Sequence, residues 1–438
     1  MSILNEQQAK QLIDRLKTYS KADEIHITVT GSRGGNIRYA RNTVTTTGQT
    51  ENIQVNVSSV FGKRTGSASG NETDEASLKR LVAVSEEIAK LAPENPEHMP
   101  MPEPQIYQSS KTFSESMAEM KPELRAGAAF NSIDAAIKSH HVAAGFLEDE
   151  TSFIAIGNSK GLFAYNKETS GDFTITVRTS DDTGSGYARQ SFTDLSGLDT
   201  AAATARAIQT AELSRNPREI QPGKYTVIMD HIAVADLLPM ILSSMDARSA
   251  DEGRSFFGKR GAGNKIGEKL FDESINIISD PFNAISPTTP FTREGLPVKK
   301  QVWIENGVLK NLSYSRYWAA QKGVEPLPSA AGMIMEGGNK SLEELIKSTE
   351  RGILVNHLWY IRSVSAQTLL YTGLTRDGVF YIEDGKIKYP IKNLRFNESP
   401  VNMLTNVIEL GQTARIGRHI IPLMKIADFN FTSVSDAV

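Results

Sequence analysis

The first half of the chain alternates between two patterns of apolar and polar positions. Apolar residues that recur every three or four positions predict helices over residues 5–19, 73–91, 113–142 and 200–214. Strict alternation of apolar and polar residues predicts strands over residues 24–30, 36–46, 52–61, 151–165 and 173–178. The glycine-rich run at residues 31–35 is expected to be a turn between two of these strands. This mixture of helices and strands is typical of an α+β domain.

The second half is dominated by short strand patterns. A strand over residues 225–229 leads into a predicted helix at 231–250, for which Asp230 is the expected N-cap. Other elements expected in this half are a helix with a capping box at 341–349 and strands at 275–278, 300–305, 308–313, 407–411 and 420–431.

A break at residues 215–223 separates the two halves. It combines proline, glycine and charged residues, which interrupt both helical and strand patterns. The sequence therefore predicts two domains, a mixed helix and sheet N-terminal domain over 1–215 and a β-rich C-terminal domain over 216–438. The fold class is α+β.

The segment 356–394 has the densest strand pattern in the chain. Apolar, aromatic and β-branched runs alternate with turn sequences at Thr372-Gly373, Asp377-Gly378 and Asp384-Gly385. Asp-Gly favours tight hairpin turns because glycine adopts positive φ without a Cβ clash. We expect a meander of three or more strands, with a basic and aromatic cluster at its start formed by His357, Trp359, Tyr360 and Arg362.

Composition limits the classes of function. The chain has 438 residues, is 39% hydrophobic and 23% charged, and has a net charge of −3 with a pI near 6.2. This acidic balance gives no electrostatic reason to expect a nucleic-acid or anionic-membrane partner. The first residues lack the apolar core of a signal peptide, and no run reaches the length of a membrane span. We therefore expect a soluble protein. The absence of cysteine fits the reducing cytosol, so the expected location is cytoplasmic.

The histidines do not form a recognisable metal motif. The sequence has seven of them, none in HExxH spacing, and it has no GxSxG elbow for a serine hydrolase. His357 is the most suggestive, because Trp359 and Arg362 follow it closely. A packed, hydrogen-bonded histidine and a catalytic one are both compatible with this pattern.

Five segments together resemble the TldD/PmbA (TldE) family of bacterial proteins. This family is historically described as modulators of DNA gyrase and is now grouped with the metallopeptidases. The matching segments follow the family's order over nearly the whole chain: RYARN at 38–42, GKRTGSA at 62–68, GLPV at 295–298, WIENGVLK at 303–310 and YIEDGKI at 381–387.

The resemblance implies how a metal would be bound, and where this chain departs from that pattern. In the family, the TldD type carries an HExxxH helix whose histidines bind the catalytic metal together with a cysteine near the C-terminus. The TldE (PmbA) type lacks these residues and pairs with it. Here the corresponding stretch, 238–244, reads LPMILSS, and the chain has no cysteine. The chain thus resembles the TldE type, with no catalytic or metal-binding residue of its own and zinc expected only in an HExxxH partner.

The leading hypothesis is a non-catalytic subunit of a two-subunit metalloprotease that acts on unfolded or small peptides. It would form a heterodimer with an HExxxH homologue, or a homodimer in its absence. Extended peptides bind sheet-rich clefts through main-chain hydrogen bonds. The candidate cleft residues are Tyr314, Arg316, His357, Trp359, Arg362 and Arg376. Two alternatives stay open, namely an independent peptidase that uses His357 or His419 and a non-enzymatic adaptor that acts on DNA gyrase or other proteins.

Overall fold

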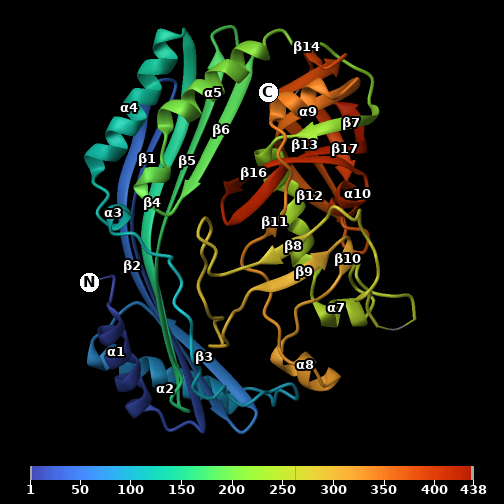
Figure 1. Ribbon diagram of the computed structural model, residues 1–438. Helices are drawn as coiled ribbons and strands as arrows, with labels where there is room; N and C mark the ends of the chain where they lie inside the picture. Colours follow the sequence, from blue (N-terminus) through green and yellow to red (C-terminus); the bar gives the residue numbers. More distant parts are fainter. Residues whose placement is uncertain (1, 262, 436–438) are drawn as a thin grey trace.

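The computed structural model describes residues 2–261 and 263–435, so the outermost residues of the two predicted domains, Met1 and 436–438, lie outside the described part. Two sheets with their flanking helices form the two halves of the molecule (Figure 1). The predicted α+β class is confirmed, including the β-rich C-terminal part. No helix in the described residues is long and apolar enough to cross a membrane. The predicted domain boundary near 215 falls between the last strand of one sheet and the first strand of the other.

The N-terminal sheet is antiparallel throughout, in the order β3-β2-β1-β4-β5-β6. Its strands are β1 (Glu24–Ala40), β2 (Thr43–Phe61), β3 (Arg64–Gly70), β4 (His141–Asn158), β5 (Phe163–Thr179) and β6 (Ser185–Phe192). Four of them are unusually long, so the sheet extends beside the whole C-terminal half (Figure 1).

Helices cover the outer face of this sheet (Figure 1). They are α1 (Glu6–Tyr19), α2 (Glu75–Leu91), α3 (Glu115–Ala118), α4 (Pro122–Lys138) and α5 (Thr200–Leu213), with a 3-10 turn η1 (Leu195–Gly197). The apolar residues of one sheet face pack against α1 and α2 at one end and against α4 and α5 at the other. The predicted helices at 5–19, 73–91 and 200–214 are confirmed, and the helical region at 113–142 consists of α3 and α4 followed by the start of β4.

The predicted turn at 31–35 is wrong, because β1 continues through it. A Cβ on Gly31 would collide with the carbonyl oxygen of Ser2, and one on Gly34 would lie 2.6 Å from the carbonyl oxygen of Asp149. These glycines therefore permit close approach rather than chain reversal. The reversal occurs at Arg41 and Asn42, whose φ angles are 49° and 58°.

The C-terminal sheet has eleven strands in the order β10-β9-β8-β11-β17-β15-β13-β12-β7, with β14 and β16 paired to β13 and β17. The strands are β7 (Gly223–Met229), β8 (Ile277–Ser279), β9 (Gln301–Glu305), β10 (Val308–Leu309), β11 (Ile334–Met335), β12 (Arg351–Ser365), β13 (Leu370–Glu383), β14 (Lys386–Pro390), β15 (Leu394–Glu398), β16 (Val407–Ile416) and β17 (His419–Val434). The helical elements of this half are α6 (His231–Leu237), η2 (Leu238–Ser244), α7 (Ala247–Asp251), α8 (Arg316–Lys322), α9 (Leu342–Lys347) and α10 (Pro400–Thr405).

The single helix predicted at 231–250 is wrong. The α-helix α6 ends at Leu237 and a 3-10 helix, η2, follows, with Pro239 in its first turn. Proline lacks the amide hydrogen that would continue the α-helical ladder, and its ring clashes with the preceding turn. Asp230 is the N-cap residue, as expected, but its side chain makes no capping hydrogen bond. This buried carboxylate makes an ion pair with Arg206 of α5 instead.

The predicted meander is confirmed as β12, β13 and β14, but two of its three turns are misplaced. Asp384-Gly385 forms the β13–β14 turn, as expected. Thr372-Gly373 and Asp377-Gly378 instead lie inside β13. Asp377 and Gly378 have φ angles of 53° and 107°, and β12 and β13 shift register beside them. The Asp-Gly sequence therefore forms an irregularity within a strand, with the backbone conformation that such a sequence favours.

Candidate functional site at the junction of the two sheets

A buried histidine–carboxylate pair lies where the two halves of the molecule meet. Nδ1 of His357, on β12, lies 3.0 Å from Oδ2 of Asp377 on the neighbouring strand β13. The hydroxyl of Ser185, on β6 of the N-terminal sheet, donates to the other oxygen of Asp377 at 2.5 Å. Burial opposes ionisation of Asp377, but the hydrogen bonds from His357 and Ser185 outweigh it and lower the pKa of this carboxyl. The pair is thus part of the contact between the two sheets.

Aromatic side chains enclose His357. Its ring stacks on Tyr187 of β6, with the ring centroids 4.3 Å apart and the planes 12° from parallel. Trp359 contacts the same imidazole edge-on at 6.0 Å, and the guanidinium of Arg376 lies 5.1 Å from the indole centroid. About half of the Trp359 surface, 49%, is exposed. The structure therefore brings three of the predicted residues together, with Trp359 as the one that faces solvent.

Asp236 of α6 is the second carboxylate beside His357. Its Oδ2 accepts a hydrogen bond from the backbone amide of Leu358 at 3.0 Å and lies 3.8 Å from Nε2 of His357. Burial raises the pKa of Asp236 to about 6, against the opposing influence of His357, the Leu358 amide and Arg189. The carboxyl therefore holds its proton more tightly than an exposed aspartate does, because its ionised form is poorly solvated.

Replacing Asp236 with asparagine will change how stability depends on pH. The folded protein binds the proton of Asp236 more tightly than the unfolded chain does, so stability falls as pH rises from 3.8 to about 6. Asparagine still accepts from the Leu358 amide but carries no charge. We expect Asp236→Asn to be more stable than the wild type by about 2 kcal/mol at neutral pH, with the gain vanishing in acid.

Denaturant unfolding at a series of pH values measures this difference. Asp384→Asn is the matched control, because Asp384 lies in the β13–β14 turn with 74% of its side chain exposed. Parallel pH profiles for Asp236→Asn and the wild type would contradict the prediction.

The other three predicted residues lie elsewhere. Arg362 is exposed further along β12, with its guanidinium 4.4 Å from the ring centroid of Tyr360. Tyr314 and Arg316 line a separate hollow of about 330 Å³. Arg316 donates to the carbonyl oxygen of Pro100. The six predicted residues therefore do not form one site, and their role in binding a substrate stays a prediction.

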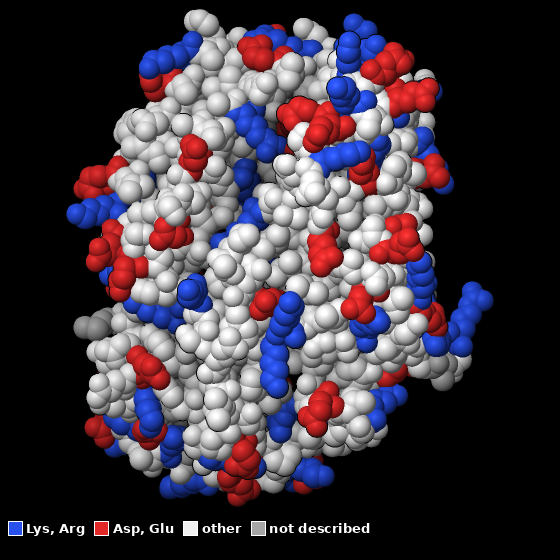
Figure 2. Space-filling view, in the orientation of Figure 1, with Lys and Arg blue, Asp and Glu red and all other residues white. Residues whose placement is uncertain are grey.

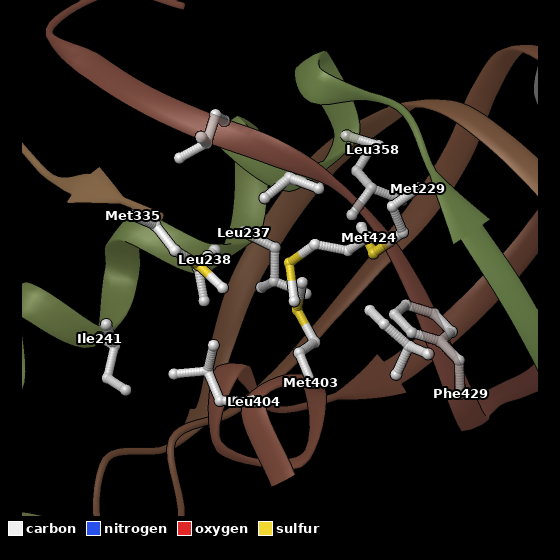
Figure 3. Close-up of a cluster of buried hydrophobic side chains, with 14 of the residues drawn as sticks. Met229, Leu237, Leu238, Ile241, Met335, Leu358, Met403, Leu404, Met424 and Phe429 are labelled. Atoms are coloured by element: carbon white, nitrogen blue, oxygen red, sulfur yellow. The ribbon is translucent and has the colours of Figure 1, made fainter. Parts of the chain in front are cut away.

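The stretch 238–244, where the resemblance would place the family's metal motif, contributes to the hydrophobic core. Leu237, Leu238 and Ile241 are completely buried. Figure 3 shows that they point into a cluster of apolar side chains rich in methionine: Met229, Met335, Met403, Leu404 and Met424. In the described residues, no group of three or more His, Asp or Glu side chains is placed to hold a metal ion. A hydrolytic metal needs fixed oxygen, nitrogen or thiolate ligands, so the side chains present here do not fit one.

Sequence reasoning missed the partners of His357. The sequence pattern places Asp377 in a turn, and Asp236 and Tyr187 belong to segments without a chemical motif. The available clue was Asp377-Gly378 in the middle of a strand-like run, since this pair favours positive φ wherever it occurs.

Three metallopeptidase family domains match the chain in order. PmbA/TldA metallopeptidase domain 1 matches residues 27–89, the central domain matches 115–215 and the C-terminal domain matches 222–433. The chain belongs to the PmbA/TldD family.

Known relatives extend over different shares of the chain. Metalloprotease PmbA of Escherichia coli O157:H7 is 22% identical over 87% of this chain and 88% of its own length. A metalloprotease of Methanothermobacter thermautotrophicus is 30% identical over 35% of this chain and 36% of its own length. The crystal structure of TldE from Thermococcus kodakarensis superposes with a TM-score of 0.86 at 22% identity, covering 97% of this chain and 99% of that one. The crystal structure of a Thermotoga maritima protein named as a modulator of a DNA gyrase superposes with a TM-score of 0.87 at 19% identity. The superposition covers 97% of this chain and 100% of that one.

Proposed function

We propose that this chain is the non-catalytic subunit of a two-subunit metalloprotease, paired with a homologue that carries the HExxxH motif. The observation that carries the proposal is the packing of 238–244, where Leu238 and Ile241 are buried among methionines. Removing these apolar side chains to make room for metal ligands would open the centre of the C-terminal core. The whole sequence also lacks cysteine, one of the ligand types that the family uses.

The contribution of this subunit would be to form part of a chamber for unfolded or small peptides. Trp359 offers an exposed aromatic surface beside Arg376, and Arg362 follows on the same strand. Aromatic and arginine side chains dominate binding energy at protein and peptide interfaces. In this proposal these three residues contact the peptide or the partner subunit, while His357 and Asp377 fix the strands that present them.

Co-expression with an HExxxH homologue from the same genome tests the assignment. We expect the two chains to co-purify as a complex that contains zinc and cleaves an unfolded protein such as casein. This chain alone should neither bind zinc nor cleave casein. The matched control is the complex whose HExxxH glutamate is replaced by glutamine, which should assemble normally and be inactive.

The opposite results distinguish the alternatives. Zinc bound to the isolated chain together with peptide cleavage would establish an independent peptidase. Histidine variants at 357 and 419 would then locate its site. Failure to form any complex with the homologue would contradict the partner-subunit assignment.

A further inference from the structure

A polar hollow of about 370 Å³ lies between the N-terminal sheet and the tip of the β16–β17 hairpin. Its size falls within the range of small-molecule sites. In Figure 2, basic side chains are visible along the upper part of the groove between the two halves of the molecule. Neither the predicted cleft residues nor the His357–Asp377 pair lines this hollow.

The wall on the N-terminal side is the sheet face that the helices leave uncovered. Along β4, Leu147 and Phe153 point to the helix-covered core, whereas Glu148 and Glu150 point to the hollow. Glu148 is directly opposite Asp172 on β5. Burial, together with Asp172 and Glu150, raises the pKa of Glu148. Glu148 and Glu150 therefore place two exposed carboxylates on the face of β4 that lines the hollow.

Most of the charged residues that line the hollow are already paired. Arg189 makes an ion pair with Asp172 at 2.9 Å, and Arg418 lies 3.6 Å from Glu168. Asp149 pairs with Arg125. After these pairs, two carboxylates and one guanidinium are left without an ion pair among residues 2–261 and 263–435: Glu148, Glu150 and Arg415.

Arg415 is held in place by neutral groups only. Its Nε donates to the carbonyl oxygen of Gly417 at 3.0 Å, and one terminal nitrogen donates to the carbonyl oxygen of Ile285 at 2.7 Å and to the hydroxyl of Thr193 at 3.4 Å. Burial and the neighbouring Arg418 lower the pKa of Arg415. The second terminal nitrogen has no hydrogen-bond acceptor in the described part of the chain. A fixed guanidinium with unused donors is a receptor for a carboxylate.

We propose that this hollow binds a short peptide with free termini, a di- or tripeptide. Its terminal carboxylate would pair with Arg415 and its terminal ammonium with Glu148 and Glu150. The unpaired positive and negative groups line the same hollow but come from opposite sides, the hairpin and the sheet. The volume of about 370 Å³ is that of a small-molecule site, so the ligand proposed to join the two sides is a short zwitterion rather than a long unfolded chain. The inference deepens the proposed function, because it gives this subunit a site for the small peptides that the protease would consume or release.

Calorimetric titration of the isolated chain with tri-alanine tests the proposal. We expect saturable binding that weakens roughly tenfold or more when the peptide is C-amidated or N-acetylated, since each change removes one charge-assisted contact. These changes are made on the ligand, so they require no altered protein to fold. Arg415→Gln should bind tri-alanine and its C-amidated form equally. The double variant Glu148→Gln, Glu150→Gln should bind tri-alanine and its N-acetylated form equally. Arg351→Gln, an exposed arginine at the start of β12, is the matched control.

Three results would overturn the proposal. They are the absence of saturable binding, equal binding of the acid and the amide to the wild type, and binding of succinate as tight as that of tri-alanine. The last would identify a general carboxylate site rather than a peptide site. Because the titration needs no partner subunit, its failure is distinguishable from failure of the co-expression test.

Discussion

A histidine introduced at Leu238 will destabilise the protein by roughly 3 to 5 kcal/mol and will not create a metal site. Leu238 is completely buried, and its neighbours in the core are apolar (Figure 3). The substitution loses apolar burial and places an imidazole among apolar side chains. The resemblance would place the family's metal motif on this stretch, and metal ligands there would have to replace side chains of the packed core.

Urea unfolding, with and without added zinc, measures this effect. Leu238→Met nearly conserves volume and is expected to cost less than about 1.5 kcal/mol. Leu213→His is the exposed control, because Leu213 is 50% exposed at the end of α5, and it should leave stability nearly unchanged. Zinc that restores the stability of Leu238→His would show that the core can form a metal site after all.

The elements that could be predicted from the sequence are those fixed by local chemistry. Asn5, Asp74 and Ser341 each accept a backbone amide at the start of the helix that the sequence places there. A capping side chain and the backbone amide that it binds are only about three residues apart, so a short stretch of sequence is enough to predict the cap. The Asp384-Gly385 turn was predictable for the same reason.

The errors arose where distant segments decide the local structure. Gly31 and Gly34 lie inside β1, where Ser2 and Asp149, both remote in sequence, leave no room for a Cβ. The candidate site shows the same limit. His357 stood out beside Trp359, but its ring partner Tyr187 comes from the other sheet. A sequence pattern indicates which residues are unusual, and only the packing of the two sheets decides which of them meet.

Replacing Asp377 with alanine will lower the free energy of unfolding by roughly 3 kcal/mol at neutral pH. The carboxylate is only 5% exposed, so its loss leaves the hydroxyl of Ser185 and the ring of His357 without their partner. Alanine also tolerates the φ of 53° less well than aspartate does. Because the folded pKa of Asp377 is lowered, its contribution is present above the unfolded value of 3.8 and is lost as pH falls through the folded pKa.

The hydrogen bonds of Asp377 join β6 of one sheet to β12 and β13 of the other, so its loss should also weaken the coupling between the two halves. We expect the calorimetric unfolding transition of Asp377→Ala to broaden or split, and trypsin to cleave the linker near residue 215 faster than in the wild type. Asp377→Asn is the matched control, since asparagine adopts the same backbone conformation and retains an acceptor, and it should cost about 1 kcal/mol. A single sharp transition for Asp377→Ala, at an unchanged midpoint, would mean that the two sheets are held together independently of this carboxylate. The ion pair of Arg206, in α5, with Asp230, which follows β7, would then be the contact between the two halves to remove next.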